Sequence, residues 1–333
     1  MPKKLQENDY LYLTAYIHSL ENRLLTRDRT ERMLEANTVA EAVKVLGECG
    51  YPELTELTPA AIDQVLATAR AELYSQLRGL VPDPGILDVF SLKYDYHNAK
   101  VLVKAEAMHT DPQPLMIDAG RWPVVRLREG YAQQELGHTS TIYAQAVAKA
   151  RETLSHTGDP QAADLVLDRA CYEELAQVAQ PVHSAFLSRY VELLVDSANL
   201  RSAVRTLRIG RGPMFLKQVL LPGGSISADA LIQAMNNTET LPRLYAGTAL
   251  AQAAEIAGEV IAGGPLAQYE RLCDDAVMHE MAGARRKALG EEPVIGYLYA
   301  KDAEFTTIRI ILTGRLAGLT TDTIRERLRE CYA

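Results

Sequence analysis

The stretch FSLKYDYHNAKVLVK, from Phe90 to Lys104, carries the pattern that decides the fold. It follows Asp83-Pro84, a typical helix start, because Asp accepts hydrogen bonds from free backbone N–H groups and Pro suits the first turn. The next break in the chain comes at 111–114, DPQP. We therefore predict one helix that begins at Pro84 and continues to Met108, about 38 Å long at about 1.5 Å per residue.

Apolar residues recur along this helix at the helical period. Such a stripe predicts a buried face, and it places His97 in the core. The stripe consists of Phe90, Tyr94, His97, Val101 and Met108. Two further long helices, predicted for about 181–210 and 293–318, carry similar stripes and also open at a proline.

A short polar motif recurs once in each of the three long helices. It reads acid-x-x-Asn/Thr-apolar-basic, with a second apolar residue four positions after the first. The three copies are Asp95, Asn98 and Lys100; Asp196, Asn199 and Arg201; and Glu304, Thr307 and Arg309. The copies are separated by 101 and 108 residues, and the length of 333 residues is three times 111. We therefore predict an all-α fold of three similar helical domains, 1–112, 113–222 and 223–333.

A weaker similarity supports this repeat. The residues from Asp168 to Leu175 align with those from Asp274 to Met281 at a constant offset of 106 residues. Glu72-Leu73 is a fainter match in the first third.

The spacing inside the motif has physical consequences. The acid and the Asn or Thr are three residues apart and lie on one side of the helix, whereas the two apolar positions are four apart and share a buried face. In the first two copies a second basic residue, Lys104 or Arg205, follows four positions after the first. Like charges at this spacing repel by roughly 0.2–0.5 kcal/mol. We therefore expect external acidic partners for these residues, and a solvated helix face is the alternative.

Shorter helices are predicted between the long ones from capping residues and periodicity. The stretch from Asp111 to Gly137 is the least regular, and we expect a linker or a short extended segment there. One helix is predicted after Thr38 and another after Ser227. The remaining predicted helices cover about 59–77, 141–157, 160–179, 242–262, 265–289 and 321–331.

Composition and charge exclude several classes of protein. With 47% hydrophobic residues and a formal charge of -8, the chain is typical of a folded globular protein and not of a nucleic-acid binder. No apolar run reaches the roughly 18–20 residues that span a bilayer. The first ten residues lack the apolar core of a signal peptide. The four cysteines form no CxxC pair and fit a reducing compartment.

The sequence lacks the common motifs for catalysis and for cofactor or metal binding. It contains no GxxxxGK[ST] loop, no strand-linked GxGxxG, no HExxH and no GxSxG. Asp95 and His97 diverge by about 200° on a helix and cannot pair. We place Asp274-Asp275 on a solvated face, and Trp122 either at an interface or over a local core. We expect no catalytic, cofactor-binding or metal-binding residue.

The stretch from Phe90 to Lys104 resembles the signature helix of the C subunit of the V/A-type rotary ATPases, which is called the d subunit in eukaryotes. The opening region is similar as well, with an aromatic helix from Tyr10 before LLTRDRTERMLEANTVAEAVKVLGECGY at 24–51. The stretches 196–205 and 304–309 match later repeats of that family, and 265–281 matches the entry helix of its third domain. The resemblance covers nearly the whole chain.

This resemblance implies a non-catalytic rotor part shaped as a funnel of three helical domains around a pseudo-three-fold axis. The wide end would sit on the membrane proteolipid ring at its cytoplasmic face, without insertion into lipid. The cavity would receive the central axle, subunits D and F, and link the ring indirectly to the catalytic A/B head. Lys100, Arg201 and Arg309 are then candidates for contact with the axle or the ring. The compact length fits a bacterial or archaeal member.

Two alternatives from other classes stay open. One is a generic all-helical scaffold unrelated to rotary ATPases, which an open helical solenoid would favour. The other is a helical enzyme that uses Tyr94, Asp95 and Asp274-Asp275, which a deep closed pocket joining these residues would support.

Overall fold

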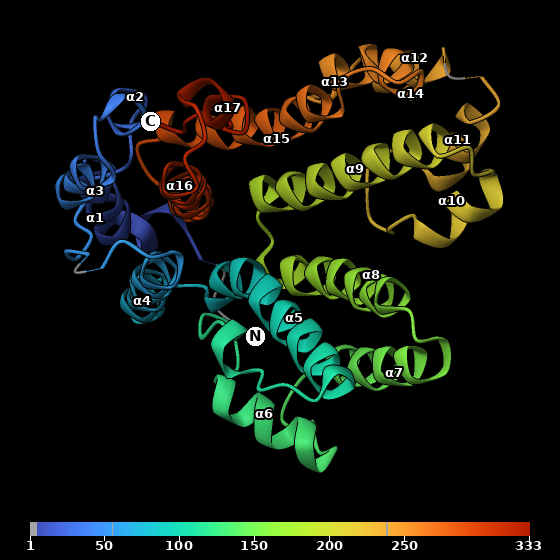
Figure 1. Ribbon diagram of the computed structural model, residues 1–333, viewed down its shortest axis with the longest axis horizontal. Helices are drawn as coiled ribbons and strands as arrows, with labels where there is room; N and C mark the ends of the chain where they lie inside the picture. The colour runs from blue at the N-terminus through green and yellow to red at the C-terminus, as the bar shows by residue number, and fades with distance from the viewer. Residues whose placement is uncertain (1–4, 55, 238) are drawn as a thin grey trace.

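Every regular element in the computed structural model, which describes residues 5–54, 56–237 and 239–333, is a helix. These residues form seventeen α-helices and four 3₁₀-helices (Figure 1). The predicted all-α class is confirmed. Residues 1–4 of the N-terminal stretch considered above lie outside the described residues. Within the described ranges, no helix combines the length and the apolar character needed to cross a membrane.

Three helices of 24 or 25 residues stand out among shorter ones that pack around them. The three are α5, α9 and α16, and each carries one copy of the polar motif. In chain order the elements are η1 Glu7–Tyr10, α1 Leu11–Glu21, α2 Arg27–Glu35, α3 Val39–Glu48, α4 Pro59–Arg78, α5 Pro84–Met108, η2 Gln113–Leu115, α6 Val124–Gln133, α7 Thr141–Thr157, α8 Pro160–Ala179, η3 Gln180–Val182, α9 Ala185–Arg208, α10 Pro213–Val219, α11 Ala228–Ala234, α12 Thr240–Tyr245, α13 Ala251–Glu255, α14 Ala257–Ile261, α15 Leu266–Ala282, η4 Gly283–Arg286, α16 Glu292–Leu316 and α17 Thr321–Arg325.

The bounds of α5 agree with the prediction. Asp83 caps the helix by accepting a hydrogen bond from the N–H of Gly85 at 2.9 Å, and Pro84 occupies the first turn. α9 begins later than predicted, because Pro181 lies in the preceding 3₁₀-helix and Ser184 provides the cap. The paired apolar positions of the motif are buried as predicted. They are Ala99, Val103, Leu200, Val204, Ile308 and Leu312.

Several shorter elements differ from the prediction. The helix expected over 242–262 is divided into α12, α13 and α14, and Gly247 lies in the first interruption, where its low helix propensity favours a turn. α15 ends at Ala282, before a 3₁₀ turn, and α17 ends at Arg325. Part of the stretch expected to be irregular is helical and forms α6.

The predicted apolar stripe holds only for the first half of α5. Phe90 and Tyr94 are buried, whereas His97 and Met108 are exposed. The prediction that His97 is a core residue is therefore wrong, and its Nε2 lies 2.9 Å from the carbonyl oxygen of Leu115. The helix is packed on more than one side, so a single stripe does not define its buried surface.

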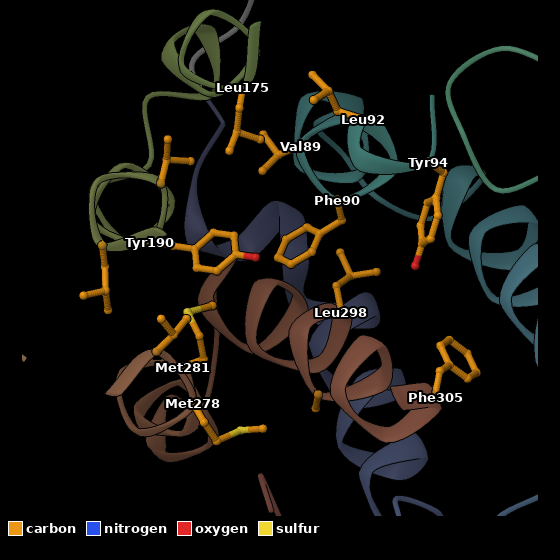
Figure 2. Packing of buried hydrophobic residues seen from close by; sticks show 14 of the residues in the cluster. Val89, Phe90, Leu92, Tyr94, Leu175, Tyr190, Met278, Met281, Leu298 and Phe305 are labelled. Atoms are coloured by element: carbon orange, nitrogen blue, oxygen red, sulfur yellow. The ribbon is translucent and has the colours of Figure 1, made fainter. Parts of the chain in front are cut away.

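The N-terminal halves of the three long helices meet in one aromatic cluster (Figure 2). Phe90 of α5 stacks on Tyr190 of α9 with ring centroids 5.3 Å apart, and Tyr190 meets Tyr299 of α16 edge to face at 5.8 Å. Leu298 of α16 lies beside Phe90 in the same cluster. Aromatic pairs in these geometries add about 0.5–1.5 kcal/mol each beyond the burial of their area. This cluster joins all three helices.

The last long helix closes the structure onto its beginning. α5 packs on α7 and α8, α9 packs on α14 and α15, and α16 packs on α1, α3 and α4. Each long helix thus contacts helices of the following predicted third, and the third long helix contacts those of the first third (Figure 1). The helices close on themselves instead of forming an open solenoid. The boundaries 1–112, 113–222 and 223–333 and the pseudo-three-fold axis stay predictions.

Candidate interaction site

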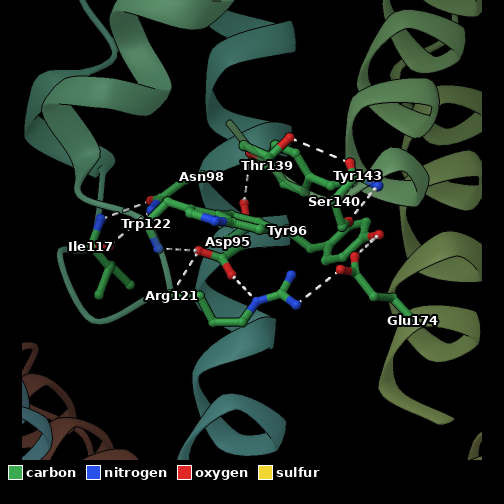
Figure 3. Close-up of polar contacts among 10 residues, drawn as sticks. All are labelled: Asp95, Tyr96, Asn98, Ile117, Arg121, Trp122, Thr139, Ser140, Tyr143 and Glu174. Atoms are coloured by element: carbon green, nitrogen blue, oxygen red, sulfur yellow. Dashed lines mark hydrogen bonds and ion pairs between the residues drawn. The ribbon is translucent and has the colours of Figure 1, made fainter. Parts of the chain in front are cut away.

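Asp95 and Asn98 on α5 hold a loop segment, residues 117–122, which we call the first strap (Figure 3). The Asn98 amide nitrogen donates to the carbonyl oxygen of Ile117 at 2.8 Å, and its oxygen accepts from the N–H of Ile117 at 2.9 Å. Asp95 accepts from the N–H of Arg121 at 3.0 Å. Both side chains are fully buried. These hydrogen bonds satisfy the buried polar groups within the chain itself.

Asp196 and Asn199 on α9 hold residues 221–226, the second strap, in the same way. The Asn199 amide donates to the carbonyl oxygen of Leu221 at 2.9 Å and accepts from its N–H at 2.8 Å. The Asp196 carboxylate accepts from the N–H groups of Ser225 and Ile226, both at 3.1 Å. The first two copies of the motif therefore have the same structural role.

A glycine in each strap makes this contact possible. A Cβ on Gly120 would lie 2.1 Å from Asp95 Oδ1, and a Cβ on Gly224 would lie 2.2 Å from Asp196 Oδ1. A side chain at either position would separate the carboxylate from the strap. Neither glycine was recognised from the sequence as part of a site, and a glycine 25 or 28 residues after the motif acid is the signal that could have found the straps.

The third copy differs, because its acid holds the beginning of the chain. Glu304 on α16 is buried and accepts from the N–H of Leu25 at 2.6 Å and from the Tyr51 hydroxyl at 2.5 Å. It also forms an ion pair with Lys301. Thr307 is partly buried in the same region. Two segments that are far apart in sequence are thus joined at this carboxylate.

The basic residues of the motif pair with acids from neighbouring helices. Lys100 lies 2.6 Å from Asp168 on α8, and Lys104 lies 2.7 Å from Asp164. Arg201 pairs with Asp274 on α15. These basic residues therefore have acidic partners within the chain, whereas the sequence predicts external ones.

The third basic residue, Arg309, completes the series. Its Nε lies 2.6 Å from Asp63 Oδ1 on α4. Asp63 therefore occupies the place of Asp168 and Asp274. Asp63 and Asp168 are 105 residues apart, and Asp168 and Asp274 are 106 apart. Glu72, suggested as a fainter match in the first third, is exposed. Of the three basic residues Arg309 has the most exposed side chain, at 60%.

A buried charge cluster lies behind the first strap (Figure 3). The guanidinium of Arg121 binds Asp95 at 2.8 Å and Glu174 of α8 at 2.9 Å, so one cation serves two carboxylates. The Tyr96 hydroxyl donates to Glu174 at 2.7 Å. Burial raises the pKa of Asp95 to about 6, although Arg121 opposes this shift. The cluster links α5 to α8 through the strap.

The other residues singled out from the sequence, Asp274, Asp275 and Trp122, contact other parts of the chain. Asp274 pairs with Arg201 and Arg329 and keeps 34% of its side chain exposed. Asp275 accepts from the N–H of Glu330 at 2.8 Å and is only 14% exposed, so it departs from the predicted solvated face. Trp122 packs against Tyr143 with ring centroids 5.1 Å apart. It is partly buried against the core, as in the second of the two predictions for it.

The residues proposed for an enzyme do not share a pocket in the structure. Cavities of about 980, 550, 440 and 430 Å³ are lined by other residues. Tyr94 donates to Asp302 at 2.5 Å, and Asp95 is held by Arg121. In the described ranges no cluster of His, Cys, Asp and Glu could hold a metal ion.

Comparison with known proteins decides the family. The model of the ATP synthase (C/AC39) subunit family matches residues 13–327. The chain belongs to this family. The resemblance to the C subunit of the V/A-type ATPases predicted from the sequence is confirmed, and with it an association with ATP synthesis and ion transport.

Relatives of the C/AC39 family match over almost their whole length. The V-type sodium ATPase C subunit of Enterococcus hirae is 22% identical over 327 residues, which cover 97% of this chain and 99% of that protein. The A-type ATP synthase C subunit of Methanocaldococcus jannaschii is 22% identical over 342 residues, covering 96% and 86%. The A-type ATP synthase C subunit of Haloquadratum walsbyi is 24% identical over 340 residues, covering 95% and 96%.

Proposed function

We propose that this chain is a non-catalytic rotor subunit that joins the central axle, subunits D and F, to the membrane proteolipid ring. It transmits torque between the catalytic A/B head and the ring during ATP-coupled transport of protons or sodium. It lies at the cytoplasmic face of the membrane, bound to protein partners without inserting into lipid. It needs no cofactor and does not bind nucleic acid.

The closure of the chain is the observation that best supports this proposal. A part that transmits torque must not shear between its helices. Here the central aromatic cluster joins the three long helices, and ion pairs connect each of them to a neighbouring group of helices. Close-packed interiors transmit strain with little compression. The geometry therefore suits a stiff coupler better than a hinged adaptor.

The exposed members of the motif are the ones that we propose for partner contact. Asp95, Asn98, Asp196, Asn199 and Glu304 are buried and bind the chain's own backbone. Lys100, Arg201, Thr307 and Arg309 are partly or largely accessible. Simultaneous charge reversal of Lys100, Arg201 and Arg309 should weaken binding to the axle or the ring, and unchanged binding to both would remove this contact role.

The proposal is tested by affinity purification of the tagged chain from its native membranes in mild detergent. We expect the proteolipid and the axle subunits to be recovered together with the chain. A chain that is recovered without both of them would contradict the proposal and favour a scaffold role outside the ATPase.

A further inference from the structure

The chain contains one run of three consecutive basic residues, Arg285, Arg286 and Lys287. None of them belongs to the repeated motif. Arg285 is used inside the protein, because it donates to the carbonyl oxygen of Tyr332 at 3.2 Å and lies over the Tyr332 ring. Arg286 and Lys287 instead line a hollow of about 430 Å³ between the start of α9, the end of α15 and the start of α16. We call this hollow the basic groove.

The positive charges of the basic groove are weakly paired. Arg189 lies 3.6 Å from Glu280, and Lys287 lies 3.8 Å from Glu292. Both distances exceed that of a normal hydrogen bond. In contrast, the amine of Lys100 lies 2.6 Å from the carboxylate of Asp168. Arg286 has no acidic partner among the residues that the structure describes, and its side chain is exposed.

The groove also has an apolar floor. Phe186 lines it and is itself only 9% exposed, and Ala282 and Ala284 contribute from the α15 side. Arg189 lies over the Phe186 ring at 5.7 Å. An apolar floor with cations at the rim suits a peptide segment that presents a hydrophobic side chain together with carboxylates.

We propose that the basic groove binds an acidic segment of the axle subunits. This inference rests on the proposed function. The chain has a net charge of -8, whereas three cations and two carboxylates line the groove, so the groove carries a local positive excess that favours an acidic segment. The groove also lies near the start of α9, where the three long helices meet. An axle that transmits torque has to be held close to that centre.

The experiment measures binding of the purified chain to a co-produced D–F axle complex by biolayer interferometry at low and moderate salt. The test variant is Arg286→Glu/Lys287→Glu. The control variant is Arg126→Glu/Lys217→Glu, which changes the net charge equally at exposed positions on α6 and α10. Thermal unfolding midpoints that match the wild type show that both variants are folded.

We expect the affinity of the wild type to fall as salt rises, and the test variant to bind about tenfold more weakly at low salt with a smaller salt dependence. The control variant should stay within about twofold of the wild type. Equal binding by the test and control variants would contradict the proposal that the basic groove binds the axle, while leaving the proposed rotor function in place. A wild-type chain that does not bind the axle at all would overturn both.

A second arm addresses a different occupant. Sedimentation with vesicles of anionic phospholipid would show whether the groove recognises a lipid surface. We expect no difference between wild type and the test variant in this assay. Loss of vesicle binding in the test variant, with axle binding intact, would overturn the proposed occupant.

Discussion

Single residues fix the straps in this protein. Asn98 and Asn199 each form the same pair of hydrogen bonds to one strap residue, and the nearby Asp binds the backbone N–H groups that follow. A buried side-chain amide that both donates to and accepts from the backbone stabilises the fold and holds the strap in one position. The acid and the amide of the motif thus clamp the chain's own loops, and only its basic and exposed members are proposed for partner contact.

The close contact between Asp95 and Gly120 can be tested by adding a single methyl group at Gly120. Gly120→Ala would place a Cβ against the carboxylate, so we expect a loss of about 1–3 kcal/mol in the free energy of unfolding. Gly137→Ala is a matched control, because nothing lies within 4 Å of a Cβ there. Urea unfolding of both variants gives the comparison. Equal midpoints would mean that the strap does not approach Asp95 so closely.

The raised pKa of Asp95 makes stability depend on pH. Its pKa is about 6 in the folded protein and about 3.8 in the unfolded chain, so the folded state binds the proton more tightly. The contribution of this proton binding to the free energy of unfolding is fully present below about pH 4 and is lost as the pH rises through about 6. Over that pH range the free energy of unfolding of the wild type should fall by about 3 kcal/mol relative to that of the Asp95→Asn variant. Denaturant titrations at pH 4 and pH 7 measure the difference, and a gain with rising pH would contradict the burial of this carboxylate.

At the scale of elements, the end of the chain acts as a lock on its beginning. Residues 331–333 lie against α2, where the N–H of Arg27 donates to the carbonyl oxygen of Ala333 at 3.3 Å. Thr30 contacts Cys331, and Tyr332 is 6% exposed against α16 and η4. This segment therefore secures α16 against α2.

Removal of the Tyr332 ring tests this lock. Tyr332→Ala should destabilise the protein by about 3–5 kcal/mol, because a large buried ring leaves a cavity. Tyr12→Ala is the control, since the Tyr12 side chain is 71% exposed and should cost less than about 0.5 kcal/mol. Chemical denaturation followed by circular dichroism reports both values. Similar costs for the two variants would show that the terminal segment is not docked.

Local sequence signals predicted most of the elements but few of the contacts between them. Asp83-Pro84 and Thr58-Pro59 set helix starts correctly, because capping depends on neighbouring residues. Pro181 misled the prediction, since a proline can also occupy a short 3₁₀ turn before the cap. The bond from Arg121 to Glu174 joins residues more than fifty positions apart, and no local pattern encodes such a contact.

At the scale of the whole molecule, the three ion-paired junctions connect α5 to α8, α9 to α15 and α16 to α4. The last of these joins the final third of the chain to the first. Exposed pairs contribute only about 0.2–1 kcal/mol each, so the junctions set the arrangement of the helices more than they stabilise it. We propose that the packed interior behind them supplies the stiffness of a rotor part.

Coupling between ATP hydrolysis and ion transport tests the rotor role most directly. The measurement compares ATP-driven ion uptake by vesicles that contain the complete ATPase with uptake by vesicles whose complex lacks this chain. We predict that uptake is lost in the depleted complex while the catalytic head still hydrolyses ATP, and that added purified chain restores uptake. Unchanged uptake without the chain would contradict the account.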